Sequence, residues 1–236
     1  MTIRVTDEEA AEIRSLELFS GLDDAHFAAL MRGAYVQNFP PLIELISEGE
    51  TSDFLHVVIS GSVELFASWN GRETTMATVE PVATFILAAT IRNAPYLMSA
   101  RTLEKSRIVL VPSEDVRAIF DVEPTFARAV VGELANAYRR VVKNTKNLKL
   151  RTSLERLANY FIYRSEAAGG VASFDLGIEK RRLASYLGMT PENLSRALRQ
   201  IQPYGVEVEG SHVTLTNIDE LRQFAKPTHL IDDPFG

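Results

Sequence analysis

Three polar side chains, Glu192, Ser195 and Arg196, have the i, i+3 and i+4 spacing that places residues on one face of a helix. Each suits the edge of a base: arginine can donate two parallel hydrogen bonds to guanine O6 and N7, glutamate can accept one from cytosine N4, and serine can do either. Other residues of the segment form an apolar face at helical spacing: Leu194, Ala197, Leu198 and Ile201. We therefore predict a helix that packs through one face and reads DNA through the other. An ordinary amphipathic helix with a solvated polar face is the alternative.

The residues before this helix supply the turn that a helix-turn-helix needs. Ala184 is small enough for the crossing of two helices, and Gly188 stands at the tight turn. Thr190 can cap the second helix, and Pro191 suits its first position, where the missing N–H costs nothing. Residues 179–201 therefore predict a helix-turn-helix, a motif whose second helix enters the major groove. Beside the three base readers, the residues that we expect to contact DNA are Arg182, Arg199 and His212.

Charge is unevenly distributed along the chain. The formal net charge is −6, which taken alone disfavours a nucleic-acid partner. Residues 139–200, however, contain 13 Lys or Arg against 5 Asp or Glu. A basic segment that includes the helix-turn-helix, joined to an acidic remainder, is typical of a DNA-binding module attached to a module with another task. We therefore expect double-stranded DNA as a partner.

Composition excludes several classes of protein. The chain has 236 residues and no cysteine, which removes disulfides, thiolate zinc sites and cysteine-ligated iron–sulfur clusters. No run is long enough for a membrane span, and residues 1–15 are too charged for a signal peptide, so we expect a cytoplasmic protein without a membrane partner. No glycine-rich phosphate loop or HExxH zinc site is present, so we expect no enzyme, no catalytic residue and no metal site. A purely structural interaction protein is the other alternative.

The pattern of apolar and polar residues changes along the chain, and with it the predicted secondary structure. Residues 7–33 look helical, and short alternating runs follow from 34 to 112, with Asn70-Gly71 as a hairpin signal. Such runs indicate an antiparallel sandwich or roll. Residues 153–166 predict a further helix. Residues 206–217 predict two strands around a turn, which is the wing of a winged helix-turn-helix.

A long helical pattern follows Pro124. Apolar residues recur there at alternating intervals of three and four, as in a coiled-coil seam, and Asn144 occupies an inward position of the kind that fixes register. Because a helix-turn-helix that reads paired half-sites needs a two-fold axis, we favour a homodimer over a helix packed on its own domain. The predicted dimer interface consists of Val130, Leu134, Ala137, Val141, Asn144 and Leu148.

Together these patterns predict an α+β chain with three parts. A sensor domain over residues 1–122 is an antiparallel β-roll with N-terminal helices, a dimerisation helix covers 123–150, and a winged helix-turn-helix DNA-binding domain covers 151–236. This order of parts resembles the CRP/FNR superfamily of bacterial transcription regulators, in which the roll is of the cyclic-nucleotide-binding type. The segment GETSDFLHVVISGSVELF at 49–66 is similar to a glycine-punctuated hairpin of the family's roll, and Leu18-Phe19 with Leu22 is similar to its opening helices.

The second helix of the helix-turn-helix carries the most specific resemblance. Its Glu192-x-x-Ser195-Arg196 pattern is similar to the FNR, DNR and FixK-like branch, where these three residues read half-sites of the TTGAT kind. In the CRP-type branch a glycine usually precedes the arginine. The resemblance thus implies a homodimeric regulator, an activator in many relatives, that binds a palindromic promoter site and acts on RNA polymerase.

The chain departs from the family's pattern at the residues that bind the regulatory ligand, or effector, in well-known members. The FNR protein itself holds an iron–sulfur cluster through cysteines, which this chain lacks. Cyclic-nucleotide binders present a glutamate to the ribose and an arginine to the phosphate, but Ala88 and Met98 stand at these positions, and neither Arg92 nor Arg101 is in register. A buried cyclic phosphate without a cation is costly, so we do not expect the cyclic-nucleotide-dependent, CRP-like alternative.

Residues 84–102 are markedly apolar, and they either fill the interior of the roll or line a pocket for an apolar effector. The resemblance to nitric-oxide-responsive members makes haem a candidate, but haem needs an axial ligand, and no histidine stands where the family's carbon-monoxide sensor has one. Without an effector, the chain would be a FixK-like regulator controlled by its own abundance. The histidines are His26, His56, His212 and His229. The predicted pocket residues are Phe85, Leu87, Ala88, Tyr96, Met98 and Tyr138.

Overall fold

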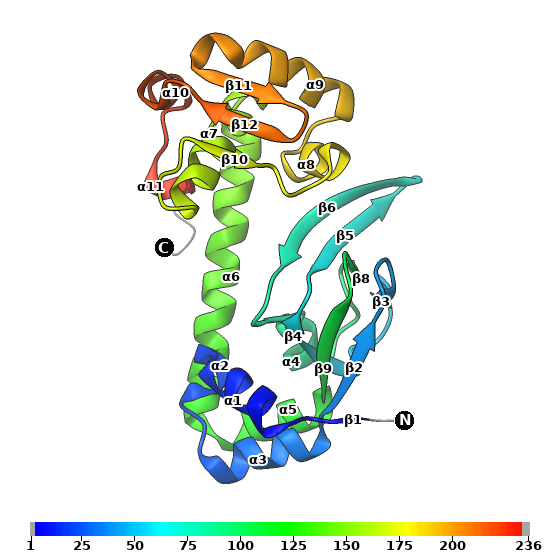
Figure 1. The fold of residues 1–236 in the computed structure, drawn as a ribbon. Coiled ribbons are helices and arrows are strands. Elements are labelled where there is room, and N and C mark those ends of the chain that lie inside the picture. The colour runs from blue at the N-terminus through cyan, green and yellow to red at the C-terminus, as the bar shows by residue number, and fades with distance from the viewer. Residues whose placement is uncertain (1–2, 233–236) are drawn as a thin grey trace. The chain divides into compact units, whose positions relative to one another are not determined.

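The computed structural model describes residues 3–232, and the chain divides into two compact units, residues 1–135 and 136–236 (Figure 1). The boundary falls within the longest helix, α6 (Pro124–Leu150), so the expected dimerisation helix contributes to both units. Among the described residues, no helix is long and apolar enough to cross a membrane.

Side-chain caps fix the first helices of the N-terminal unit. The Thr6 hydroxyl accepts a hydrogen bond from the Glu9 N–H at 3.3 Å, and the Glu9 carboxylate accepts one from the Thr6 N–H at 2.9 Å. Asp23 caps the third helix through the His26 N–H. The predicted helical stretch consists of three helices: α1 (Asp7–Ser15), α2 (Glu17–Ser20), which has no side-chain cap, and α3 (Asp24–Gly33).

Two antiparallel sheets follow, which confirms the predicted β-domain. One has the order β1 (Ile3–Arg4), β2 (Tyr35–Phe39), β9 (Ser106–Pro112), β4 (Phe54–Ser60) and β7 (Ala83–Phe85). The other has the order β3 (Glu44–Ile46), β8 (Ser99–Thr102), β5 (Val63–Trp69) and β6 (Arg72–Val79). The turn between β5 and β6 is the predicted hairpin, in which Asn70 and Gly71 both have positive φ, as a two-residue type I′ turn requires.

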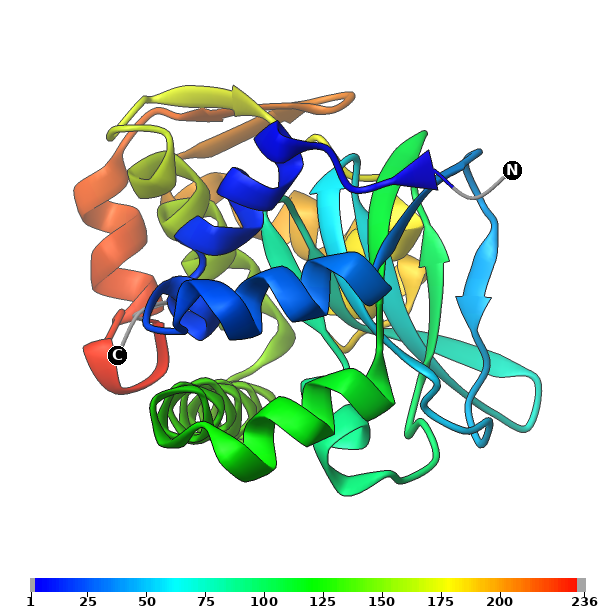
Figure 2. The ribbon, with the colours of Figure 1, turned by 90° about the horizontal axis from the view of Figure 1, so that it is seen from below.

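The N-terminal unit contains two clusters of buried apolar side chains. Side chains from both sheets pack together in the roll, among them Val58 and Ile108 of the first sheet and Val63 of the second. The second cluster lies among the helices and includes Phe19, Phe126 and Val130. Figure 2, seen from below, shows α3 beside α5 (Ser113–Val122), and the short α4 (Leu87–Arg92) also contacts α5.

The C-terminal unit is the predicted winged helix-turn-helix. A three-stranded antiparallel sheet has the order β10, β12, β11, and β11 and β12 are the two strands of the wing. Helices α7, α8, α9 and α10 pack on one core with this sheet. The elements are α7 (Ser153–Ala167), β10 (Ser173–Asp175), α8 (Lys180–Tyr186), α9 (Pro191–Gln200), η1 (Gln202–Tyr204), β11 (Val206–Glu209), β12 (His212–Leu215), α10 (Ile218–Ala225) and α11 (His229–Asp232).

Candidate nucleic-acid interface

The turn between α8 and α9 forms as its residue types predict. Gly188 adopts a φ of +62°, a left-handed conformation that a residue with a Cβ rarely takes. The N–H of Met189 then donates to the Ala184 carbonyl at 2.9 Å. Thr190 is the N-cap of α9, its hydroxyl accepting from the Asn193 N–H at 3.2 Å, and Pro191 is the first helical residue.

Helix α9 separates its residues into two faces. The four apolar residues predicted to pack inward, Leu194, Ala197, Leu198 and Ile201, are at most 8% exposed. Glu192, Ser195 and Arg196 are exposed, and so is Arg199. The three proposed base readers therefore lie on an accessible face of a helix that is anchored through its other face.

Local contacts prepare these side chains for polar recognition. The Ser195 hydroxyl donates to the Pro191 carbonyl at 3.0 Å, which leaves its oxygen free to accept. The Arg196 guanidinium donates to the amide oxygen of Asn193, a residue that the sequence argument did not single out. A hydrogen bond from its own N–H, with a further one from the Thr190 hydroxyl, lowers the pKa of Glu192, so its carboxylate is an acceptor at neutral pH.

The basic residues of α8 differ in exposure, and the one expected to contact DNA is the least exposed of them. Arg182, expected to contact DNA, is half-buried, and within residues 3–232 its buried Nε has no hydrogen-bond partner. Lys180 and Arg181 are exposed in the first turn of the same helix. These two side chains are better placed than Arg182 to meet a phosphate.

His212, expected to contact a phosphate, is held among acidic side chains of the wing. Its Nδ1 lies 3.2 Å from the Asp175 carboxylate, and Glu209 pairs with it on the neighbouring strand. A phosphate that approached His212 would also approach these carboxylates, which would repel it. The wing geometry therefore does not favour a phosphate contact by His212.

A buried arginine that the sequence argument missed joins the turn to α6. Arg156 is 7% exposed, and its guanidinium donates to the carbonyls of Leu187 at 2.8 Å and Arg151 at 2.7 Å, with a longer bond to Gly188 at 3.3 Å. Burial lowers its pKa. Because Leu187 ends α8 and Arg151 directly follows α6, one cation neutralises the negative ends of two helices.

The residues predicted to line an effector pocket are distributed over two clusters of the N-terminal unit, its surface and the C-terminal unit. Phe85 and Tyr96 belong to the cluster inside the roll, whereas Leu87 belongs to the cluster among the helices. The reason is that α4 begins at Leu87, so successive side chains leave the backbone in different directions, and Ala88 is exposed. Met98 is half-buried. Tyr138 belongs to the other unit and is 70% exposed.

Neither arginine of residues 84–102 changes the expectation that a cyclic phosphate is not bound. Arg101 donates to Glu64 at 2.8 Å and to Glu73 at 3.0 Å, and its guanidinium lies 4.2 Å from the centre of the Phe66 ring. Arg92 is exposed at the end of α4. Arg101 would have to abandon a buried carboxylate, Glu64, to reach any ligand in the roll.

His56 is the only histidine between residues 34 and 112, and it lies in the packed interior of the roll. Its ring centre is 4.9 Å from that of Phe85, and its Nδ1 is 3.1 Å from the Phe54 carbonyl oxygen. Burial lowers its pKa to about 4, so the imidazole is neutral. Because His56 is only 4% exposed, a haem could reach its ring only if this part of the packed interior opened, so the residues as packed do not fit a haem site.

Burial along α6 changes the predicted dimer interface. Val130 is 0% exposed within its own unit and Leu134 packs partly on the same cluster, so Val130 has no surface left for a second copy. The large apolar side chains exposed on α6 include Val131, Tyr138 and Val141, at 60%, 70% and 63%. Of the six predicted interface residues, Val130 is therefore the one that its own unit covers, and Val131 beside it is exposed instead.

Two protein families match this sequence. The family described as "Cyclic nucleotide-binding domain" matches residues 36–123, and the "Crp-like helix-turn-helix domain" matches residues 155–224. Together they cover about two thirds of the chain, and they fall on the roll and on the helix-turn-helix.

Relatives that align across both matched regions agree with them. The CRP-like cAMP-activated global transcriptional regulator of Mycobacterium tuberculosis is 23% identical over 215 residues, which cover 89% of this chain and 96% of the relative. The transcriptional activator protein FnrA of Stutzerimonas stutzeri is 24% identical over 176 residues, 72% of each chain. The structure of FixK2 from Bradyrhizobium japonicum has the same fold, with a TM-score of 0.68 at 21% identity over 80% of this chain and 96% of that one. The chain belongs to the CRP/FNR family of DNA-binding transcription regulators, which are not enzymes.

Proposed function

We propose that the chain works in the cytoplasm as a homodimer that reads the two halves of a palindromic promoter site of the TTGAT kind. The observation that carries this proposal is the exposed face of α9, where Glu192, Ser195 and Arg196 stand opposite a fully packed face. Arg196 with guanine and Glu192 with cytosine match the base edges that a TTGAT half-site and its complement offer. The exposed Lys180 and Arg181 supply charge for the phosphates.

The CRP family is typically dimeric, and the dimer in this proposal forms along α6. Val131, Tyr138 and Val141 expose large apolar surfaces at heptad spacing, which an isolated chain would leave in water. A parallel pair of α6 helices would place two α9 helices about one DNA turn apart, roughly 34 Å, on the same side of the duplex. A dimer bound at a promoter in this way could recruit RNA polymerase.

For its regulation we propose the FixK-like alternative, in which the amount of protein sets the response. The predicted pocket residues are divided between two packed clusters and the surface, and Arg101 is held by Glu64. The relative from M. tuberculosis is described as cAMP-activated. In this chain Ala88 and Met98 stand where a cyclic nucleotide would need a glutamate and an arginine, so cyclic AMP should not change DNA affinity.

The test is DNA binding by fluorescence anisotropy, with a TTGAT palindrome and a scrambled duplex at several salt concentrations. Arg196→Ala should cost about 1–3 kcal/mol on the palindrome and relax preference at one base position. Arg181→Ala, a matched exposed arginine on α8, should weaken both duplexes alike and reduce the salt dependence. Equal losses on both duplexes for Arg196→Ala would contradict base reading, and no preference of the wild-type protein for the palindrome would refute the proposed target.

A further inference from the structure

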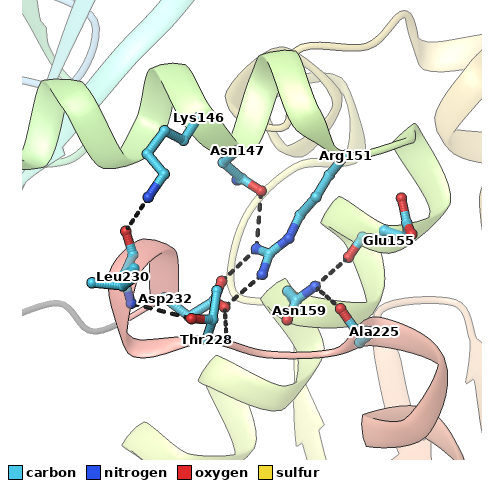
Figure 3. A network of polar contacts seen from close by, with 9 residues as sticks. All are labelled: Lys146, Asn147, Arg151, Glu155, Asn159, Ala225, Thr228, Leu230 and Asp232. Atoms are coloured by element: carbon cyan, nitrogen blue, oxygen red, sulfur yellow. Dashed lines mark hydrogen bonds and ion pairs between the residues drawn. The ribbon is translucent and has the colours of Figure 1, made fainter.

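The segment that follows α10 folds back onto the end of α6 (Figure 3). Asp232, in α11, accepts two hydrogen bonds from the guanidinium of Arg151, at 2.6 and 2.7 Å. The two side chains are only 8% (Arg151) and 22% (Asp232) exposed. A bidentate ion pair that is largely shielded from solvent fixes the orientation of the two side chains as well as their distance, unlike an ordinary surface ion pair.

Further contacts hold both partners of this pair. Asp232 also accepts from the Thr228 N–H at 2.7 Å, and Arg151 also donates to the Asn147 side chain at 3.2 Å. Lys146, one turn earlier on α6, donates to the Leu230 carbonyl at 3.2 Å. The segment thus contacts α6 through Lys146 and the residue that follows the helix through Arg151, and both contacts are drawn in Figure 3.

The other end of the segment is attached to α7. The Asn159 amide donates to the Ala225 carbonyl at 2.9 Å and to the Glu155 carbonyl of its own helix at the same distance. Residues 225–232 therefore bridge α6 and α7 across their junction at Arg151 and Thr152. We call residues 225–232 the C-terminal brace.

Arg156 holds the same junction from α7, because it donates to the carbonyl of Arg151 and to that of Leu187 in the turn before α9. Leu148 also lies against this turn: a Cβ on Gly188 would come within 2.5 Å of it. The last turns of α6, the brace and the turn before α9 are thus connected by direct contacts within one unit.

We propose that Arg151 and Asp232 are positioning residues for DNA reading: they fix the direction in which α6 enters the helix-turn-helix, and so the separation of the two α9 helices in the dimer. This inference rests on the proposed dimeric reading of a palindrome. A loose junction leaves each helix-turn-helix its own contacts with a half-site. Once the first helix-turn-helix is bound, a loose junction lowers the effective concentration of the second at its half-site. Affinity is therefore lost only on DNA that carries two half-sites.

The test compares Asp232→Asn with the wild-type full-length chain on three duplexes: a TTGAT palindrome, the same palindrome with one base pair added between its halves, and a single half-site. Asp232→Asn should weaken binding to the palindrome about tenfold and leave binding to the single half-site within about twofold of wild type. The ratio between the affinities for the palindrome and for the lengthened palindrome should become smaller. Arg151→Lys, which keeps the charge but not the two-pronged geometry, should act in the same direction. The double variant Arg151→Asp with Asp232→Arg, in which the two charges are exchanged, should recover part of the lost affinity for the palindrome.

A matched control is the ion pair between Arg222 and Glu166, which lies in the same unit at 2.8 Å but is 45% and 54% exposed and does not involve α6. Glu166→Gln should leave all three affinities unchanged. Equal losses on the palindrome and the half-site for Asp232→Asn, or no loss on either, would overturn the positioning role.

Amide hydrogen exchange separates this inference from the proposed function, because it needs no DNA. Asp232→Asn should speed exchange in the last two turns of α6, and Glu166→Gln should not. If exchange is unchanged there, the brace does not hold the junction, whatever the chain binds. If exchange responds but the wild-type protein prefers no palindrome, the proposed target is wrong and the brace stands as a structural device only.

Discussion

Gly188→Ala tests the turn on which the geometry of the helix-turn-helix depends. At a φ of +62° an alanine costs about 1–2 kcal/mol in backbone strain. Its Cβ would also come within 2.5 Å of Leu148 Cδ2. Leu148 is 42% exposed and can move away by leaving its preferred rotamer, at roughly 1 kcal/mol. The expected loss in the free energy of unfolding is therefore about 2–3 kcal/mol.

The wing offers a matched control for the backbone term. Gly210 has a φ of +63°, and an added Cβ there meets no atom of the described chain within 4 Å. Gly210→Ala should therefore cost only the strain of about 1–2 kcal/mol. The difference between the two variants, about 1 kcal/mol, measures the contact between the turn and α6.

The assay is urea denaturation followed by far-UV circular dichroism, analysed as separate transitions if the two units unfold independently. In a Leu148→Ala background, Gly188→Ala should lose its excess cost and match Gly210→Ala. If Gly188→Ala is no more costly than Gly210→Ala, or if Leu148→Ala brings no relief, the turn does not pack on α6 as described and the reasoning is refuted.

Two further perturbations probe the roll and the dimer. The unfolded imidazole of His56 titrates near pH 6.5 and the buried one near 4, so the unfolded chain binds more protons between these values and stability falls as the pH is lowered through this window, by up to about 3 kcal/mol. His56→Leu should flatten this part of the curve of unfolding free energy against pH, and an unchanged slope would show that His56 is not buried. Val141→Glu should raise the dimer dissociation constant about a hundredfold in sedimentation analysis, because two unpaired carboxylates would face each other. Val122→Glu, at an equally exposed valine on α5 (64%), should leave the dimer dissociation constant unchanged. If both variants dissociate the dimer to the same extent, α6 is not the interface.

The helix-turn-helix could be predicted because its signals are local. The spacing of Leu194, Ala197 and Leu198 defines the buried face of α9, and the types of Thr190 and Pro191 define its start. These preferences act within one or two helical turns, so they are readable without knowing what packs on the helix. The Asn70-Gly71 hairpin was predictable for the same reason, since the turn needs two residues with positive φ.

The register of the exposed stripe on α6 was beyond the reach of periodicity. Val130 and Val131 are both apolar and adjacent, so the sequence permits either to face outward. Only the cluster around Phe19 and Phe126, which buries Val130, decides between them. The same applies to the predicted effector pocket: a run of apolar residues does not tell which of two cores each side chain joins, and Phe85 and Leu87 join different ones.

By itself, then, the sequence determined a DNA-reading helix, its capped start, its polar face and the absence of cysteine ligands, because these depend on residue type and on spacing within a few residues. The tertiary structure alone decided that His56 is buried and neutral, that Arg101 is held by Glu64, and that Arg151 meets Asp232, which is 81 residues away in the chain. Contacts between residues so far apart depend on how the whole chain packs, and no local pattern encodes them.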